Sequence, residues 1–226
     1  MTLNLAIWDM DGTIVDSREI IGWAMDRAFE ACGRPAPGYE QTRQIVGLGL
    51  KEACAQLVPE GLSEVEIKAL AEAYSAAFIS RREDADFSEP LYAGALETLE
   101  RLADAGWLIA MATGKSRRGI RALFEMHPLE QYFDTIHCAD DGPGKPHPAM
   151  CLDAMDKMGA EPHQSIMIGD AIHDIRMGRS AGVYTMAVTW GFGLRNELEA
   201  VDPHEIHDDF HTLNESLDRF RARDSL

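Results

Sequence analysis

Near the start of the chain stands Leu5-Ala6-Ile7-Trp8-Asp9-Met10-Asp11-Gly12-Thr13, an apolar run that ends in two carboxylates and a glycine. Residues i and i+2 of a strand point to the same face, so Asp9 and Asp11 are expected close together at the end of a strand. Gly12 permits a sharp turn there. Two carboxylates this close resist joint ionisation, which favours a retained proton or a bound cation. One ionised carboxylate, one proton donor and Mg²⁺ are the parts that form and break an aspartyl-phosphate.

The composition excludes several classes of partner. The chain has 226 residues, of which 46% are hydrophobic, and this fits one large domain or a core with a smaller unit. Its formal charge of −17 repels nucleic acid and anionic membranes, so neither is an expected partner. The apolar runs are shorter than a membrane span, and no basic region of a signal peptide precedes the first strand. We therefore expect a cytoplasmic protein with reduced, mostly buried thiols at its cysteines, which are Cys32, Cys54, Cys138 and Cys151.

Strand-like apolar runs alternate with helical patterns along the second half of the chain. The runs cover residues 3–8, 108–112, 135–138, 165–168 and 183–188. Alternation of strands and helices predicts an α/β fold with a parallel sheet covered on both faces. A further junction of a strand and a helix is predicted across His204, His207 and His211, whose mixed spacing does not favour a metal site. Ligands of such sheets bind at the carboxyl ends of the strands.

Residues 17–86 interrupt this alternation with helical patterns alone. One amphipathic helix follows Ile21, Met25 and Ala28 and ends before Gly33, and a second follows Ile67, Leu70 and Tyr74. A shorter helix is predicted between residues 50 and 57. The sequence therefore predicts a helical unit, 17–86, inserted after the first strand of a core formed by residues 1–16 and 87–226.

Three further motifs follow predicted strands or turns. Thr113 and Gly114 offer a hydroxyl and exposed backbone N–H groups, which can hold phosphoryl oxygens. Lys145 lies on a proline-bounded turn before a helix. Asp170 and Asp174 are four residues apart, so they can share one face at the start of a helix.

Together with Asp9-Met10-Asp11-Gly12-Thr13, these motifs resemble, in their order, those of the haloacid dehalogenase-like superfamily of phosphohydrolases. The resemblance covers the whole chain and extends to the phosphoglycolate phosphatase-like branch, whose helical cap occupies the place of residues 17–86. It implies a Rossmann-like core. Members that cleave carbon–halogen or phosphonate bonds replace the second aspartate, and Asp11 is present here, which favours phosphate esters.

The resemblance also implies roles for individual residues. Asp9 would attack phosphorus, and Asp11 would protonate the leaving oxygen and then accept a proton from water. Thr113, Gly114 and Lys145 would bind the phosphoryl group. Mg²⁺ would be held by Asp9, the backbone carbonyl of Asp11 and Asp170, an oxygen-rich set that suits this ion. Behind these ligands, Asp174 would orient a metal-bound water or Lys145.

Substrate choice is expected to depend on the stretch of residues 43–51. Its glycines suggest a loop that can approach the core closely, and Arg43 or Lys51 could meet a substrate carboxylate or second phosphate. An ordinary corner between helices with solvated basic residues explains the stretch equally well. Thr113 could in addition cap the helix that follows it, and Lys115, Arg117 and Arg118 are expected to face solvent at the start of that helix.

These observations predict Mg²⁺-dependent hydrolysis of a small phosphomonoester, and the resemblance makes phosphoglycolate the leading substrate. Two alternatives stay open: a sugar-phosphate mutase that uses the same aspartyl-phosphate, and a non-catalytic regulatory protein that keeps the fold. The retention of all core motifs argues against the second alternative. The sequence does not predict the oligomeric state.

Overall fold

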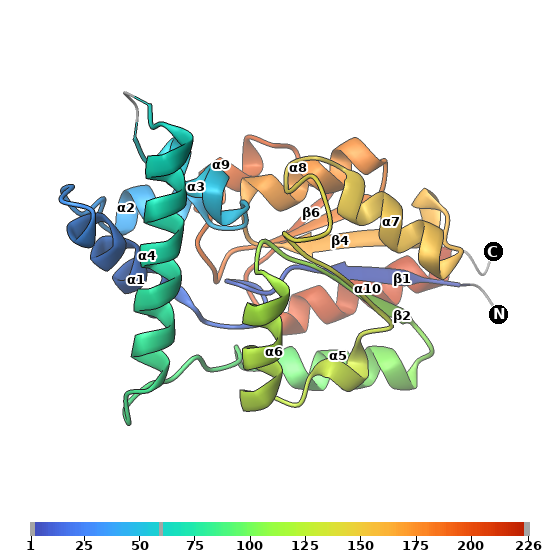
Figure 1. The fold of residues 1–226 in the computed structure, drawn as a ribbon. Coiled ribbons are helices and arrows are strands. Elements are labelled where there is room, and N and C mark those ends of the chain that lie inside the picture. The colour runs from blue at the N-terminus through green and yellow to red at the C-terminus, as the bar shows by residue number, and fades with distance from the viewer. Residues whose placement is uncertain (1–2, 59–60, 224–226) are drawn as a thin grey trace.

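A parallel sheet of six strands forms the centre of the molecule (Figure 1). The computed structural model describes residues 3–58 and 61–223. The order of the strands is β3-β2-β1-β4-β5-β6, and every pair is parallel. Their bounds are Leu5–Trp8 (β1), Leu108–Ala112 (β2), Thr135–His137 (β3), Ser165–Gly169 (β4), Tyr184–Val188 (β5) and Glu205–His207 (β6). The predicted parallel sheet is confirmed, and so is the strand at the C-terminal histidines.

The two faces of β1 explain why the sheet is covered on both sides. Ala6 and Trp8 pack into one apolar cluster, with residues of α5 (Ala95–Asp104), α6 (Arg117–Met126) and α10 (Phe210–Arg223). Leu5 and Ile7 pack into another, with residues of α7 (Ala149–Met158) and α8 (Ile172–Ala181). Strands that are buried on both faces are continuously apolar, as this one is. The core also contains the short helix α9 (Arg195–Glu199) and 3₁₀ turns at Glu130–Tyr132 and Pro162–Gln164.

Between β1 and β2 the chain forms a group of helices, which we call the helical insert, at one end of the sheet (Figure 1). It consists of α1 (Arg18–Ala31), α2 (Tyr39–Thr42), a 3₁₀ turn (Arg43–Ile45), α3 (Leu50–Gln56) and α4 (Glu64–Arg82). A capping box between Ser63 and Glu66 fixes the start of α4. Met25, Phe29 and Leu70 belong to a separate apolar cluster of the insert.

The chain leaves and re-enters the core through two adjacent segments. The backbone N–H of Asp16 donates to Pro90 at 2.8 Å, and that of Tyr92 donates to Ile14 at 2.9 Å. This pairing holds the base of the insert against the end of β1. The division into units at residues 17–86 stays a prediction, and residues 1–2 and 224–226 of its core lie outside the described residues.

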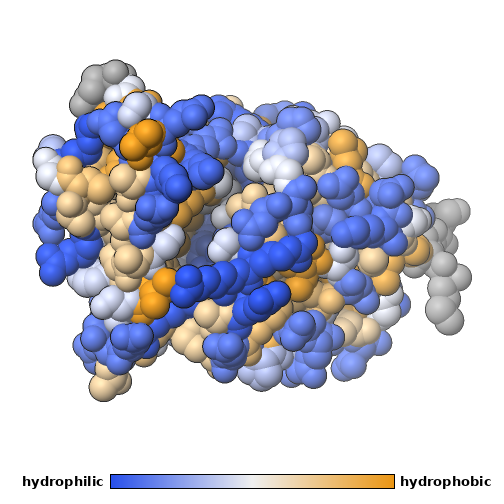
Figure 2. All heavy atoms as spheres, viewed as in Figure 1, coloured by the Kyte–Doolittle hydropathy of each residue, from blue (hydrophilic) through white to orange (hydrophobic). Residues whose placement is uncertain are grey.

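The surface is rich in polar residues, and the cysteines are free thiols, as the composition leads one to expect. One face is mainly hydrophilic, with scattered hydrophobic residues and a hollow between the insert and the core (Figure 2). All four cysteines are free thiols, and only Cys32 among them is exposed. Within residues 3–58 and 61–223, every helix is too short or too polar to cross a bilayer.

Candidate active site

The carboxyl ends of the central strands bring the predicted motifs to one edge of the sheet. Asp9 follows β1 and Asp170 follows the neighbouring β4, and the N–H of Asp9 donates to Ile168 at 2.9 Å. Thr113 follows β2 on the other side of β1, and it is fully buried. Residues more than a hundred positions apart in the chain therefore meet because their strands are neighbours.

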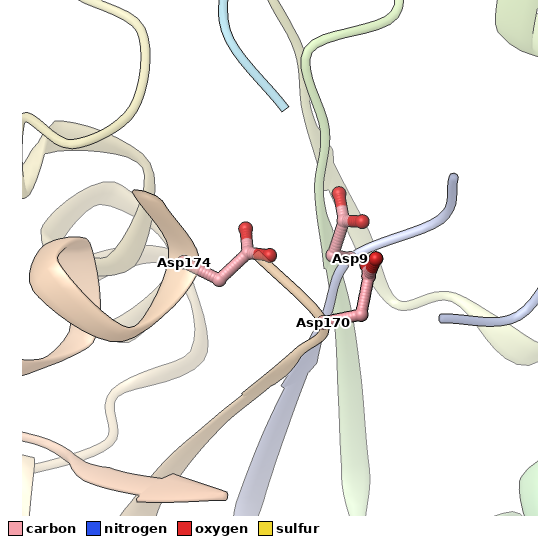
Figure 3. A group of neighbouring side chains, drawn as sticks. All are labelled: Asp9, Asp170 and Asp174. Atoms are coloured by element: carbon pink, nitrogen blue, oxygen red, sulfur yellow. The ribbon is translucent and has the colours of Figure 1, made fainter. Parts of the chain in front are cut away.

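Three buried carboxylates, those of Asp9, Asp170 and Asp174, form a compact group (Figure 3). Each offers an oxygen, and these oxygens lie within 4.8 Å of one another. The Asp170 carboxylate accepts from the hydroxyl of Thr13 at 2.9 Å and from the N–H of Phe192 at 2.7 Å. Gly12, at a φ of +87°, lies so close to Asp170 that a Cβ would stand 2.3 Å from its Oδ2. A glycine is therefore required where the turn passes this carboxylate.

Lys145 neutralises part of this acidic group. Its Nζ contacts Oδ1 of Asp9 and lies 2.6 Å from Oδ1 of Asp174, and the lysine is fully buried. Burial opposes the charge on Lys145, but Asp174 and Asp9 raise its pKa overall. Burial raises the pKa of Asp9 as well, against the attraction of Lys145. Burial and the charge of Asp174 raise the pKa of Asp170 to about 7.

The donor set of the three carboxylates fits Mg²⁺. Three acids share one lysine, so the group retains a negative charge that a buried site does not tolerate well without a cation. Oδ1 of Asp174 contacts Lys145 and its Oδ2 accepts from the N–H of Ala171 at 3.0 Å. This leaves Asp9 and Asp170 as the carboxylates best placed to bind a hard cation through oxygen, with Asp174 behind them.

Thr113 does not cap the helix that follows it. The N-cap of α6 is Ser116, whose hydroxyl accepts from the N–H of Gly119 at 3.3 Å. The Thr113 hydroxyl instead accepts from the N–H of Lys115 at 3.2 Å. Thr113 is therefore fixed at the strand end by the turn that begins at Gly114.

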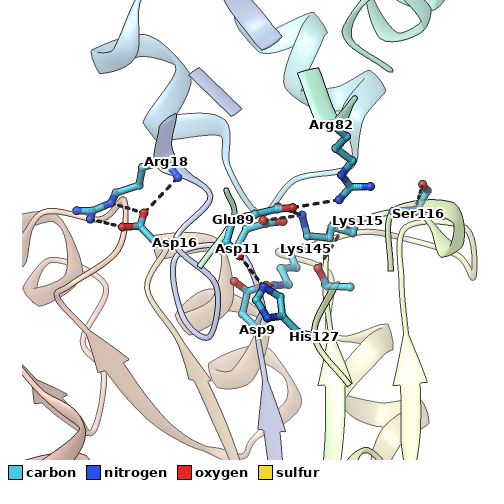
Figure 4. A network of polar contacts seen from close by, with 12 residues as sticks. Asp9, Asp11, Asp16, Arg18, Arg82, Glu89, Lys115, Ser116, His127 and Lys145 are labelled. Carbon is cyan, nitrogen blue, oxygen red and sulfur yellow. Dashed lines mark hydrogen bonds and ion pairs between the residues drawn. The ribbon is translucent and has the colours of Figure 1, made fainter. Parts of the chain in front are cut away.

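The expectation that Lys115 faces solvent is wrong. Its side chain is 8% exposed, and its Nζ lies 2.8 Å from Oδ1 of Asp11 and 3.2 Å from Oε1 of Glu89 (Figure 4). Burial opposes the charge on Lys115, yet Asp11 and Glu89 raise its pKa overall. Arg117 and Arg118 are exposed as expected. The lysine escaped prediction because its neighbours in space are remote in sequence.

The sequence analysis did not predict that Glu89 lies in this region. Its side chain is fully buried, and it accepts from Arg82 at 3.1 Å as well as from Lys115. A single glutamate before Pro90 carries no motif, so only the burial and the two cations around it disclose its importance.

The loop of residues 47–49 approaches the core closely, as its glycines suggested. A Cβ on Gly114 would stand 2.7 Å from the backbone oxygens of both Gly47 and Leu48. A Cβ on Gly47 would in turn lie 3.9 Å from Cδ of Lys145. The insert therefore lies directly over Gly114 and close to Lys145 in this structure.

The two basic candidates of the insert lie apart from this contact. Arg43 is buried, and its guanidinium binds Glu197 of the core at 2.8 and 2.9 Å and Glu40 at 2.8 Å. Lys51 is exposed near the start of α3. Arg43 also lines a pocket of about 620 Å³ between the insert and the core, which includes His173 and Arg176. A role of Arg43 or Lys51 toward substrate stays a prediction.

The chain is similar to known proteins over most of its length. The family model described as "Haloacid dehalogenase-like hydrolase" matches residues 6–188. A relative named "Probable phosphatase IndB", from Dickeya dadantii, is 34% identical over 209 residues, covering 91% of this chain and 90% of the relative. A phosphoglycolate phosphatase from Agrobacterium fabrum is 34% identical over 218 residues, covering 94% and 91% of the two chains.

A solved structure has the same fold. The crystal structure of a predicted phosphoglycolate phosphatase from Haemophilus somnus superposes with a TM-score of 0.84 at 23% identity, covering 96% of this chain and 99% of that one. The family match includes Asp9, Thr113 and Asp170. The chain belongs to the haloacid dehalogenase-like hydrolase family.

Proposed function

We propose that this protein is a Mg²⁺-dependent phosphatase that hydrolyses a small phosphomonoester through an aspartyl-phosphate on Asp9. One observation carries the proposal: Lys145 bridges Asp9 and Asp174 beside Asp170, fully buried at the carboxyl edge of the sheet. This arrangement holds a nucleophilic carboxylate, a cation for the phosphoryl group and the ligands of a metal ion within one small site.

In the first step a carboxylate oxygen of Asp9 attacks phosphorus. An O–P bond to Asp9 forms while the bond from phosphorus to the leaving oxygen breaks, and Asp11 gives its proton to that oxygen. Thr113, the N–H groups that follow it and Lys145 hold the remaining phosphoryl oxygens. The products of this step are a free alcohol and the phosphorylated Asp9.

In the second step a water molecule attacks the phosphorus of phosphorylated Asp9. Asp11, now ionised, takes a proton from this water, and the bond between phosphorus and Asp9 breaks. Inorganic phosphate leaves, and both aspartates return to their starting states. The same carboxyl group thus serves as acid and then as base.

Mg²⁺ bound by Asp9, the backbone carbonyl of Asp11 and Asp170 would neutralise charge on the phosphoryl group and offset the repulsion between the acids. Lys145 supplies a further positive charge from the chain itself. Asp174 keeps Lys145 in place through the contact at 2.6 Å.

The helical insert is proposed to act as a cap. The contact of Gly47 and Leu48 with Gly114 excludes bulk water from the phosphoryl-binding motifs, which strengthens every charge interaction there. Two adjacent linkers, near Asp16 and Pro90, allow the cap to open for substrate and product.

Phosphoglycolate is the proposed substrate because several relatives carry that name, including those of Agrobacterium fabrum and Pseudomonas putida. The same names favour hydrolysis over a mutase reaction. The test is a screen for phosphate release from phosphoglycolate, hexose phosphates and an aryl phosphate, with and without Mg²⁺. Release that requires Mg²⁺ supports the proposal. Conversion of one hexose phosphate into another without phosphate release would support the mutase instead, and inactivity on every substrate would refute both.

A further inference from the structure

Glu89 is an unusual residue for a site that handles phosphate, because it places a buried negative charge beside Asp11. Its carboxylate is balanced from two sides, by Arg82 at 3.1 Å and by Lys115 at 3.2 Å. A buried acid without such partners would destabilise the fold strongly. The phosphoryl chemistry proposed for Asp9 and Lys145 does not use this acid, so its presence needs a separate explanation.

Lys115 connects Glu89 to Asp11. Its Nζ lies 2.8 Å from Oδ1 of Asp11, and the ring of Phe78 on α4 lies 5.5 Å from the same nitrogen. The four charged groups alternate in sign in the order Asp11, Lys115, Glu89 and Arg82 (Figure 4). We call this set the charge chain. Its formal charges cancel when Asp11 is ionised, and one positive charge is left when Asp11 carries the proton that it donates.

The charge chain is anchored in both parts of the molecule. Glu89 directly precedes Pro90, whose carbonyl accepts from the N–H of Asp16, and Nε2 of His127 lies 2.7 Å from the carbonyl oxygen of Glu89. These contacts attach Glu89 to the core. Arg82 is the last residue of α4, so it belongs to the helical insert.

We propose that Lys115 and Glu89 are positioning residues for the carboxylate of Asp11, and that Arg82 makes this position depend on the placement of the helical insert. The inference rests on the proposed function, because it takes Asp11 as the group that carries the proton. Lys115 contacts Oδ1, which leaves Oδ2 for the transfer. Transfer from a carboxyl group requires it to lie within hydrogen-bond reach of the leaving oxygen, so fixing one oxygen of Asp11 positions the other.

The inference is tested by comparing two phosphate esters whose leaving groups differ in their need for a proton. Ethyl phosphate releases an alkoxide that must be protonated, whereas dinitrophenyl phosphate releases a stable phenolate that needs no proton. Replacing Lys115 by methionine, Lys115→Met, removes the charge but keeps most of the side-chain length. In single-turnover reactions with Mg²⁺, we expect the variant to cleave ethyl phosphate about 100-fold more slowly than wild type, the size of a general-acid contribution.

The rate of the initial burst of dinitrophenolate should change by less than about threefold in the same variant, because Lys115 does not take part in forming the bond between Asp9 and phosphorus. Equal losses on both esters would overturn the inference, because they would indicate general damage to the site. A loss on phosphoglycolate with none on ethyl phosphate would also overturn it, because Lys115 would then bind the leaving-group carboxylate. Wild-type enzyme that cleaves neither of these esters nor phosphoglycolate would refute the proposed function itself, which is a separate result.

A second variant separates loss of positioning from loss of stability. Lys115→Met leaves Glu89 with a single cation, whereas the double variant Lys115→Met with Glu89→Gln removes one charge of each sign. The double variant should unfold near the wild-type temperature and still discriminate against ethyl phosphate. A folded double variant that cleaves both esters at wild-type rates would overturn the inference.

The dependence of Asp11 on the helical insert is tested with two matched arginine variants. Arg82→Gln should slow the cleavage of ethyl phosphate by about tenfold, while Arg81→Gln, which removes exposed pairs with Asp84 and Asp86, should not. Equal rates in these two variants would limit the charge chain to the core and overturn the dependence on the insert.

Discussion

The guanidinium of Arg43 in the helical insert donates two hydrogen bonds to the carboxylate of Glu197 in the core, at 2.8 and 2.9 Å. The two residues are 154 positions apart, and a third bond joins Arg43 to Glu40. Such paired bonds are specific in geometry as well as in charge. Near this contact, Nε2 of His173 lies 3.0 Å from the carbonyl oxygen of Gln44. Together these contacts join the insert to α8 and α9 of the core.

This ion pair changes what is expected of Arg43. If its main role is to hold the insert against the core, Arg43→Ala and Glu197→Ala should lower kcat/KM to a similar extent on carboxylated and neutral substrates. The double variant should be no worse than either single one, with a coupling energy of about 1–2 kcal/mol. A double-mutant cycle on phosphoglycolate and an aryl phosphate measures this. Arg27→Ala, which breaks an exposed pair with Glu30, is the control. A loss confined to phosphoglycolate in Arg43→Ala alone would instead show that Arg43 reads the substrate.

Gly114→Ala should prevent the insert from covering the site. The new Cβ would stand 2.7 Å from two backbone oxygens of the insert, which cannot move aside as a flexible side chain can. We expect kcat/KM to fall by about tenfold or more while the protein stays folded, because only the closed arrangement is strained. Gly144→Ala is a matched control, since its Cβ would meet the nitrogen of Gly49 at an ordinary 3.7 Å. Equal activity of the two variants would show that the close approach at Gly114 does not matter for turnover.

Asp9→Asn should abolish turnover without unfolding the protein. An amide is a poor nucleophile, and Lys145 keeps its contact with Asp174 in the variant. Phosphate release and thermal unfolding measured on the same sample separate the two effects. In wild type, beryllium fluoride should form its adduct on Asp9. Turnover at the wild-type rate in Asp9→Asn would disprove the aspartyl-phosphate mechanism.

Chelation of metal should stop the reaction and Mg²⁺ should restore it, while Ca²⁺ should inhibit because it prefers more ligands and a looser geometry. A readout without turnover is the unfolding temperature, which a ligand of the native state raises. Mg²⁺ should raise it in wild type and leave it nearly unchanged in Asp170→Asn. Full activity in excess chelator would rule out a metal requirement.

The buried acid Asp170 predicts how the metal-free protein responds to pH. Burial raises its pKa from 3.8 to about 7 in the folded state, so folding favours the protonated form. Its contribution to stability is therefore complete below about pH 4 and is lost as the pH rises toward about 7. In chelator, Asp170→Asn should become more stable relative to wild type across this range, by an amount on the order of a few kcal/mol. Denaturant unfolding at several pH values measures the difference, and a difference that does not vary with pH would contradict the prediction.

The sequence by itself determined the parallel sheet, the group of helices between β1 and β2, and the residues that follow the central strands. The apolar run before Asp9 had to be a buried strand, and continuous apolar strands separated by helices form parallel sheets. In such a sheet the carboxyl ends of the strands share one edge, so the sequence alone predicts that Asp9, Thr113 and Asp170 lie close together. The glycines of residues 47–49 suggested a close approach to the core without excluding an ordinary corner between helices, and the structure shows the approach at Gly47.

Only the tertiary structure decided which charges lie beside these motifs. Lys115 and Arg117 are alike in sequence, yet Lys115 is buried against Asp11 and Glu89 while Arg117 is exposed. Glu89 and Arg43 depend in the same way on partners that lie far away in the chain or in the other part of the molecule. The physical reason is that periodicity reports the burial of apolar faces, whereas a charged residue is buried only where the folded chain supplies an opposite charge.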